Sequence, residues 1–420
     1  MQSVSPAPVT PIARGGGPTD PSHDEALRRG IINTEVSRGV AWLLTVLFLV
    51  AIYAVPLAQH VLEKRADEES PLADLVRRPP TAENLRQLEK SIEDASYAKA
   101  WVQPRMQLLL TGHGRVGNKL AVVGHGGWLY YTPGVLHVGG PGFLEPEVLR
   151  GREKEALDAG QEPIHADPRP AIFAFQRALA QRGIRLVLLP MPDKAALERG
   201  PLSGRAEPTQ NVDYDRFLAE IRAGGVTVFD ARDSAHGARG EPLFLSQDTH
   251  FAPAYMERIA RDLAGVVTSL GVLSAPSAAP ALHVVEQPAA RVGDLVDMLK
   301  LPEDQQLFRP QTVLVHQVQD ATGNPWEPDA SADVLLLGDS FTNIFTLEGM
   351  GWGTAAGLAP HLALSLARPL DVIAQNDAGA FATRQSLSRE LGAGQDRLAG
   401  KRVVIWEFAS RELSVGDWKP

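Results

Sequence analysis

Two hydrophobic patterns follow one another along this chain of 420 residues. The first is a single apolar run, Val40–Ala58 (VAWLLTVLFLVAIYAVPLA), which contains no charged residue. At about 1.5 Å per residue, a helix of this length just crosses a hydrocarbon layer about 30 Å thick. The alternative is a buried core helix, but such helices usually keep a polar stripe, which this run lacks. The pattern therefore predicts a membrane-spanning helix.

The flanks of the apolar run predict its orientation. Arg28, Arg29 and Arg38 precede it, whereas Lys64 and Arg65 follow it. Because basic residues stay on the cytoplasmic side, this excess places the N-terminus inside and the bulk of the chain outside. The long region before the run and the lack of a small-x-small cleavage site favour an uncleaved signal anchor over a signal peptide.

The second pattern begins near Leu108, where short aliphatic runs alternate with amphipathic segments. Helical stretches such as Ala171–Gln181 and Tyr255–Leu270 lie between the aliphatic runs. Buried strands that alternate with helices predict a parallel sheet covered by helices on both faces. The predicted strands are Arg185–Pro190, Val226–Asp230, Val334–Ser340, Leu370–Ala374 and Arg402–Trp406.

Local composition adds boundaries to these patterns. From Met1 to about Gly30 the chain is rich in Pro, Gly, Ser and Thr without an apolar period, which is typical of disorder. Beyond the apolar run, a charged and mostly helical pattern is interrupted by Pro79-Pro80 and Pro104. The predicted segments are a disordered cytoplasmic tail (1–38), a transmembrane signal anchor (39–59), a helical stalk or linker (60–107) and an α/β domain (108–420).

Composition excludes several classes of function. The 41 basic and 50 acidic residues leave a net charge of −9, which argues against nucleic-acid binding. Without cysteine, the chain has no thiolate zinc site, iron–sulfur cluster or cysteine nucleophile, and its histidines lack metal-ligand spacing. Gly112–Gly117 matches G-x-G-x-x-G, but the β pattern of Leu120–Tyr131 follows it instead of a helix, so no dinucleotide site is expected. We expect neither a metal nor a cofactor.

The strongest chemical motif ends one of the predicted strands. Val334–Leu337 runs into Gly338-Asp339-Ser340, and Thr342–Met350 is able to start a helix. This context places Ser340 at the carboxyl edge of the sheet, where backbone N–H groups at a helix start can hold a developing oxyanion. The alternative interpretation is that Asp339 or Ser340 only caps the helix, as these residue types often do.

A second motif, Ser246–Phe251 (SQDTHF), places an aspartate two positions before a histidine. A serine nucleophile needs a base that is itself oriented by a carboxylate, and Asp248 and His250 supply both from one loop. The alternative for any single Asp-x-His is a capping aspartate beside a surface histidine. The presence of both motifs in one chain favours a catalytic serine.

Together the motifs resemble the SGNH/GDSL hydrolase superfamily, which carries a Gly-Asp-Ser nucleophile and an Asp/His pair on a flavodoxin-like parallel sheet. Here Asp248 and His250 precede Ser340 by about ninety residues, the reverse of the usual order, as in a circularly permuted fold. This order, the Asp-Thr-His block and the N-terminal anchor resemble the periplasmic alginate O-acetyltransferase family (AlgX/AlgJ-like). The resemblance covers roughly Gly117 to Leu413 and implies an SGNH-like acetyltransferase domain over residues 108–420.

The resemblance also implies roles for individual residues. Ser340 would accept the acetyl group, His250 would act as its base, and Asp248 would hold the imidazole. The backbone N–H of Ser340 would be one oxyanion donor, with Gly379 as the candidate for a second donor and Asn376 as a weaker one. Glu407-Phe408-Ala409-Ser410-Arg411 stands where the superfamily has Gly-x-Asn-Asp, so the third donor is unassigned. Further candidates for substrate or oxyanion binding are Lys194, Arg384 and Arg411, and Trp352 is either a core residue or a sugar-stacking one.

The function implied by the resemblance is acetyl transfer to hydroxyls of a polysaccharide outside the cytoplasmic membrane. The acetyl group would come from a membrane-bound acyltransferase, and the chain would sit in the inner membrane with its catalytic domain in the periplasm. An acetylesterase with the same triad and a non-catalytic polysaccharide-binding scaffold are the alternatives. The acidic net charge leaves a neutral polymer as open as alginate.

Overall fold

The computed structural model describes residues 37–236, 240–274, 281–376 and 379–419. The predicted disordered tail falls almost wholly on residues 1–36 and therefore lies outside the described part. The chain divides into two compact units, residues 1–102 and residues 103–420, which are described separately. The three boundaries between the four predicted segments stay predictions.

The first unit is helical. Helix α2 (Arg38–Ala66) contains the predicted apolar run and is long and apolar enough to cross a membrane, with none of its most apolar stretch buried. Membrane insertion and orientation stay predictions. The chain turns at Pro79-Pro80, as predicted, but the predicted interruption at Pro104 is wrong: α5 continues through this proline, which removes only one i→i−4 hydrogen bond. The other helical elements are η1 (Pro71–Ala73), α3 (Asp74–Arg77), α4 (Ala82–Asp94) and α5 (Tyr97–Gly114), the last of which continues into the second unit.

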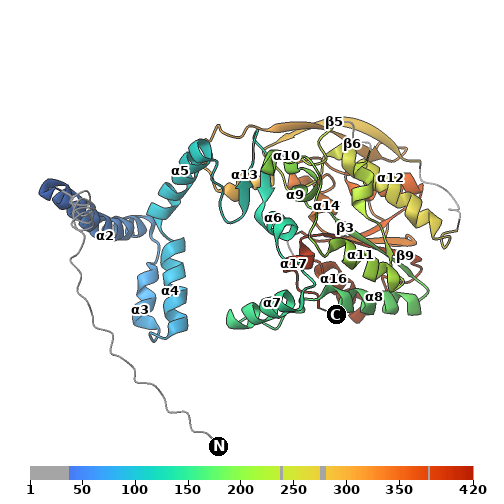
Figure 1. The fold of residues 1–420 in the computed structure, drawn as a ribbon, viewed down its shortest axis with the longest axis horizontal. Coiled ribbons are helices and arrows are strands. Elements are labelled where there is room, and N and C mark those ends of the chain that lie inside the picture. Colours follow the sequence, from blue (N-terminus) through green and yellow to red (C-terminus); the bar gives the residue numbers. More distant parts are fainter. Residues whose placement is uncertain (1–36, 237–239, 275–280, 377–378, 420) are drawn as a thin grey trace, which may run out of the picture. The chain divides into compact units, whose positions relative to one another are not determined.

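A five-stranded sheet forms the centre of the second unit, and all of its neighbouring strands are parallel (Figure 1). Each predicted aliphatic run supplies one strand, so the predicted parallel sheet is confirmed. The spatial order is β4-β3-β9-β7-β8. The strands are β3 (Arg185–Met191), β4 (Thr227–Val228), β7 (Val334–Gly338), β8 (Asp371–Ala374) and β9 (Val403–Ala409).

The strand order bears on the predicted circular permutation. Counting can start at β7, which carries the Gly-Asp-Ser motif, pass through the C-terminus and resume at β3. The order across the sheet then becomes 2-1-3-4-5, which is the flavodoxin-like order. The observed order is thus the one that a permuted chain would have, and the permutation itself stays a prediction.

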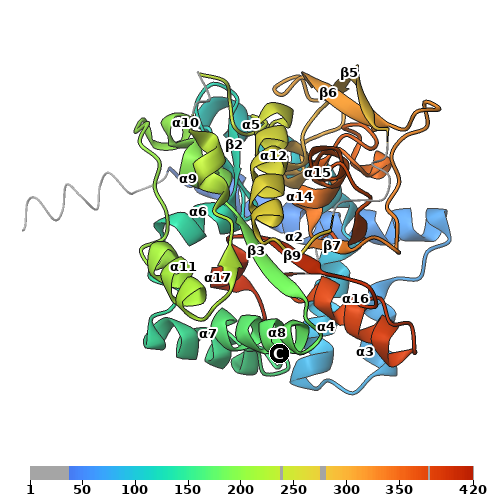
Figure 2. The same cartoon turned by 90° about the vertical axis from the view of Figure 1, so that its right-hand side faces the viewer.

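Helices cover both faces of this sheet, as predicted (Figure 2). Successive side chains of β3 alternate between the faces: Val187 and Leu189 join one apolar core, and Leu186 and Leu188 join the other. The first core contains residues of α12 (Pro253–Ser269) and α15 (Leu358–Leu366). The second contains residues of α8 (Pro168–Gln181), α11 (Tyr214–Ala223) and α16 (Ala382–Gly392).

Two antiparallel hairpins and several short helices complete the unit. The helix that starts at the Gly-Asp-Ser motif has four residues, Ser340–Asn343. The hairpins pair β1 (Ala121–Val123) with β2 (Leu129–Tyr131) and β5 (His283–Arg291) with β6 (Gln311–Gln319). The short helices are α6 (Thr132–Gly139), α7 (Pro146–Asp158), α9 (Lys194–Leu197), α10 (Arg199–Ser203), η2 (Ala231–Ala235), α13 (Asp294–Leu299), α14 (Ser340–Asn343), η3 (Glu348–Met350) and α17 (Glu412–Val415).

Candidate functional site

The carboxyl edge of the sheet gathers most of the candidate residues. Lys194 follows β3, Ser340 follows β7, Asn376 follows β8 and Arg411 follows β9. Because the strands are parallel, their carboxyl ends meet at one edge, which is where open α/β sheets bind ligands. The loop that carries Asp248 comes after β4, the edge strand.

The Asp-Thr-His loop folds back on itself and fixes the pair that the sequence predicted. An isolated antiparallel bridge between Phe244 and Phe251 closes the loop. Inside it, His250 Nδ1 lies 2.7 Å from Asp248 Oδ1, and both side chains are buried. With Nδ1 donating to the carboxylate, the lone pair of the neutral imidazole is on Nε2. Asp248 therefore fixes the orientation and the tautomer of His250.

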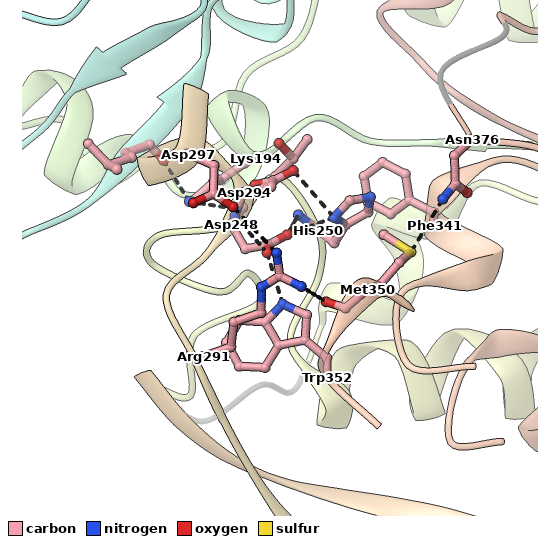
Figure 3. Close-up of polar contacts among 12 residues, drawn as sticks. Lys194, Asp248, His250, Arg291, Asp294, Asp297, Phe341, Met350, Trp352 and Asn376 are labelled. Carbon is pink, nitrogen blue, oxygen red and sulfur yellow. Dashed lines mark hydrogen bonds and ion pairs between the residues drawn. The ribbon is translucent and has the colours of Figure 1, made fainter. Parts of the chain in front are cut away.

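The other oxygen of Asp248 is held from two further directions (Figure 3). The indole Nε1 of Trp352 donates to Oδ2 at 2.9 Å, and the backbone N–H of Asp294 donates to it at 3.1 Å. Trp352 is fully buried, so of the two interpretations left open above, the core position is correct. Its N–H group nevertheless belongs to the site, because it fixes the carboxylate that orients His250.

The electrostatics of the pair favour its charged form. Burial opposes ionisation of Asp248, but the hydrogen bond and the charge of His250 outweigh burial and hold the pKa of this carboxyl well below its usual range. Burial also lowers the pKa of His250, whereas the hydrogen bond to Asp248 and its charge raise it. The net result is a His250 pKa above the ordinary value. The imidazole is thus a stronger base than free histidine.

A second carboxylate lies beside the pair. Asp294 Oδ1 accepts the backbone N–H of Thr249 at 2.7 Å, and Oδ2 lies 3.9 Å from His250 Nδ1. Burial and the charge of Asp248 raise the pKa of Asp294 to about 6. Ligand atoms of Asp248, His250 and Asp294 all lie within 4.8 Å of one another, close enough for a metal ion. A cation there would have to displace the proton that His250 donates to Asp248, so the hydrogen-bonded pair is the better interpretation of this cluster.

Lys194, a candidate for substrate binding, is buried. Its ammonium group donates to the carbonyl oxygens of Leu129 at 2.6 Å, Ser246 at 2.9 Å and Asp248 at 2.9 Å. All three hydrogens of the ammonium group are therefore used within the protein. Burial lowers the pKa of Lys194 to about 7. Lys194 holds the Asp-Thr-His loop against β2.

Ser340 is the first residue of α14 and is half-buried. Asp339 caps this helix by accepting the N–H of Phe341 at 2.8 Å, so the capping interpretation is correct for Asp339. The N–H of Ser340 itself occupies the first helical position, where no intrahelical acceptor exists.

The two motifs, about ninety residues apart in sequence, meet in the fold. The His250 ring packs edge-on against Phe341, the neighbour of Ser340, with 4.9 Å between ring centroids. Within the described residues, His250 Nε2 is buried without a hydrogen-bond partner, so it makes no hydrogen bond with Ser340 Oγ. Such bonds often form only when substrate is bound. The Asp–His half of the predicted triad is thus formed, and the Ser–His contact stays a prediction.

Among the other predicted cations, Arg411 lies at the site. Its guanidinium group donates to Asp193 at 3.3 Å and stacks on the rings of Tyr131 and Phe341, with centroids 5.1 and 5.9 Å away. Arg384 is placed elsewhere, on α16, where its guanidinium group covers the indole ring of Trp406 at 4.7 Å. No contact joins Arg384 to the Asp–His pair in the described part of the chain, and burial lowers its pKa to about 10.

The two predicted oxyanion residues after β8 are placed differently. Asn376 accepts a hydrogen bond from Asn343 of α14 at 2.8 Å, so it lies beside the helix that begins with Ser340. Gly379 is exposed with φ +73°, and a Cβ added to it would lie 3.3 Å from Glu412 Oε2. No interaction of the described residues connects Gly379 with Ser340. The oxyanion assignment therefore stays a prediction for both residues.

Comparison with known proteins agrees with this architecture. A parallel sheet with an Asp–His pair and a Gly-Asp-Ser turn at its carboxyl edge is what the SGNH hydrolase-like class combines. The family model described as "SGNH hydrolase-like domain, acetyltransferase AlgX" matches residues 121–410, which is more than half of the chain. The chain therefore belongs to this acetyltransferase family, and the predicted resemblance is confirmed.

Individual relatives support the same placement. The chain is 28% identical over 299 residues to the "Probable alginate O-acetylase AlgJ" of Pseudomonas aeruginosa, covering 69% of this chain and 74% of the relative. It is 26% identical over 262 residues to the protein of the same name from Azotobacter vinelandii, covering 59% and 63%. The solved "O-Acetyltransferase Domain of Pseudomonas putida AlgJ" superposes with a TM-score of 0.52 at 22% identity, covering 70% of this chain and 92% of that domain. This last likeness concerns the fold.

Proposed function

We propose that this protein is a serine-dependent O-acetyltransferase that modifies hydroxyl groups of an extracytoplasmic polysaccharide, of which alginate is the first candidate. The observation that carries the proposal is the buried Asp248–His250 pair, whose imidazole ring packs against Phe341, the residue that follows Ser340, and whose Nε2 has no partner in the described residues. The names of the AlgJ relatives supply alginate as the acceptor. Helix α2 is proposed to anchor the chain in the inner membrane, with the catalytic domain in the periplasm and a membrane-bound acyltransferase as the source of the acetyl group.

The proposed reaction has two halves. In the first, His250 Nε2 takes the proton of Ser340 Oγ while Oγ attacks the acetyl carbonyl carbon of the donor, and His250 then returns that proton to the leaving group. In the second, His250 deprotonates a sugar hydroxyl that attacks acetyl-Ser340, and the proton returns to Ser340 Oγ. Asp248 stabilises the imidazolium in both halves. The N–H of Ser340 is proposed as one oxyanion donor, with Asn376 or Gly379 as further donors and Arg411 as a contact for the acceptor.

The experiment supplies the full-length protein in detergent with a chromogenic acetyl ester and an oligosaccharide of the candidate polymer. Mass spectrometry then locates the trapped acetyl group, and chromatography separates acetylated sugar from free acetate. We expect acetyl-Ser340 as the intermediate and acetylated oligosaccharide as the main product. Ser340→Ala should remove turnover, whereas Ser388→Ala, at an exposed serine of α16, should leave it unchanged.

Each other result identifies an alternative. Free acetate as the only product would make the protein an acetylesterase with the same chemistry. Labelling at another residue would overturn the mechanism. A Ser340→Ala variant that supports wild-type polymer acetylation in cells would indicate the non-catalytic polysaccharide-binding scaffold.

A further inference from the structure

A buried acidic side chain contacts the turn from Gly338 to Thr342, which carries Ser340. This side chain has no part in the reaction described above. Glu407 is the fifth residue of β9, and its side chain is 1% exposed. Its Oε2 accepts the backbone N–H of Asp339 and the hydroxyl of Thr342, each at 2.9 Å. These two donors lie on either side of Ser340 along the chain. Glu407 therefore ties the turn that carries Ser340 to the neighbouring strand.

Gly338, the glycine of the Gly-Asp-Ser motif, leaves space for the carboxyl group of Glu407. A Cβ added to Gly338 would lie 2.9 Å from Glu407 Oε2 and 2.1 Å from Thr342 Oγ1. Any side chain at position 338 would thus separate the carboxyl group from the turn. The glycine of the Gly-Asp-Ser motif is required here for the close approach of Glu407.

The second carboxyl oxygen of Glu407, Oε1, differs from Oε2 in its hydrogen bonding. Within the described residues, Oε1 is buried and has no hydrogen-bond partner. A carboxylate left in that state would be an uncompensated buried charge, which is strongly unfavourable. A carboxylic acid at the same position has an O–H group to donate, and the carboxyl group of Asp339 lies within its reach. The arrangement thus fits a protonated Glu407.

Asp339 is the member of the pair that fits the ionised form. Its Oδ1 accepts the N–H of Phe341 and its Oδ2 accepts the N–H of Ala409, each at 2.8 Å. Hydrogen bonds from N–H groups favour a carboxylate. Burial, and then the negative charge of Asp339, raise the pKa of Glu407 well above its ordinary value. Ionisation of both adjacent carboxyl groups would place two negative charges side by side in a buried position, which is strongly unfavourable.

We propose that Glu407 is kept as a neutral carboxylic acid, shares its proton with the Asp339 carboxylate and positions Ser340 by fixing the turn from Gly338 to Thr342. The inference rests on the proposed function, because it takes Ser340 as the nucleophile. Glu407 is a positioning residue, since its contacts are with the turn. A neutral acid also keeps a second negative charge away from the oxyanion that forms at Ser340 during acyl transfer.

The test compares Glu407→Gln with Glu407→Ala in the full-length protein, using the same acetyl ester. An amide keeps an acceptor for Asp339 N–H and Thr342 and supplies an N–H in place of the acid proton. We therefore expect Glu407→Gln to keep kcat within about threefold of wild type, whereas Glu407→Ala loses about a hundredfold in kcat with KM little changed. As the pH rises through the raised pKa of Glu407, wild-type kcat should decline, and Glu407→Gln should lack this decline.

A second measurement does not depend on turnover. The infrared difference spectrum between wild type and Glu407→Gln at neutral pH should contain the carbonyl band of a protonated carboxyl group. A difference spectrum without that band would overturn the inference. A Glu407→Gln variant as inactive as Glu407→Ala would overturn it too. Retained turnover in Ser340→Ala would instead overturn the proposed function, and the infrared band would still report the protonation of Glu407. Thermal unfolding of each variant checks that the fold is kept.

Discussion

Two buried lysines lie at opposite edges of the same parallel sheet. Lys401, just before β9, is at the amino edge. It donates to the carbonyl oxygens of Ala330 and Ala332, each at 2.6 Å, and to Asp371 at 2.9 Å. Asp371 also receives two hydrogen bonds from Arg397, at 2.6 and 2.8 Å. The charges at this edge are therefore compensated within the fold.

Lys194, at the carboxyl edge, is compensated differently. It donates to three backbone carbonyls, of Leu129, Ser246 and Asp248. In the described part of the chain no carboxylate forms an ion pair with it. The cation is used instead to hold the loop that carries Asp248 and His250, and burial lowers its pKa to about 7.

The two edges of the sheet differ in how their buried polar groups are paired, and this difference suggests that one edge serves stability and the other catalysis. At the amino edge, both oxygens of Asp371 have hydrogen-bond partners. At the carboxyl edge, His250 Nε2 and Glu407 Oε1 are buried without partners in the described residues. Arg368 Nε, just before β8 at the amino edge, also lacks a partner there, but the same guanidinium group pairs with Asp333 at 2.6 Å. An unpaired buried polar atom in a native fold calls for an explanation such as a functional role. The amino edge is thus expected to determine the free energy of unfolding, and the carboxyl edge the rate of acetyl transfer.

The largest effect should come from the base. Replacing His250 with Gln removes the group that we propose accepts the proton of Ser340, so kcat should fall by about 10⁴-fold or more. His361→Gln provides the matched control, because His361 is also buried but belongs to α15 and donates to the carbonyl of His316 at 2.8 Å. Steady-state rates with the acetyl ester measure both variants. Equal losses in the two would contradict the assignment of His250.

The next effect should appear in stability alone. Asp371→Ala leaves Lys401 as a buried charge without its carboxylate, which should lower the free energy of unfolding by about 3–5 kcal/mol. Chemical denaturation measures this loss. The turnover of the folded fraction should equal that of wild type, because Asp371 lies at the other edge of the sheet. A loss of kcat in the folded protein would contradict the expectation that the amino edge affects stability alone.

Lys194 and Lys401 can each be replaced by methionine, and the two single variants can be compared directly. Each substitution leaves buried carbonyl oxygens without a donor and should lower the free energy of unfolding by about 1–3 kcal/mol. Only Lys194→Met should also reduce kcat, by about tenfold, because the Asp-Thr-His loop loses its anchor. Unfolding curves and kcat values of both variants check this. A Lys401→Met variant with the same loss of kcat would show that the effect is general destabilisation.

The sequence predicted the parts of this molecule that local pattern controls. Five continuous aliphatic runs became the five strands, because burial on both faces requires apolar residues at consecutive positions. The Asp248–His250 pair was predictable because its members are two residues apart on one loop. The Gly-Asp-Ser turn was predictable because it ends a strand.

Contacts that depend on the docking of distant segments could not be read from the chain. Trp352 and Asp294 both bind Asp248, but from 104 and 46 residues away. Lys194 and Arg384 were candidates for substrate binding, but a strand end alone does not reveal whether a cation meets a ligand or buried carbonyls and rings. Glu407 carried a partial signal, since an acid inside an otherwise apolar strand, VVIWEFA, must find a partner.

The smallest effect is a shift in pH dependence. His250 acts as a base only when neutral, and its pKa is raised, so the rate should fall as the pH drops through a value above that of ordinary histidine. In Asp248→Asn the opposing influence of burial remains while the hydrogen bond to a carboxylate and its charge are lost. The acidic limb of kcat/KM should therefore move to lower pH, in the small residual activity. Asp371→Asn, at the amino edge, should leave the limb where it is in wild type. A limb that moves in both variants, or in neither, would mean that the Asp248 carboxylate does not set the basicity of His250.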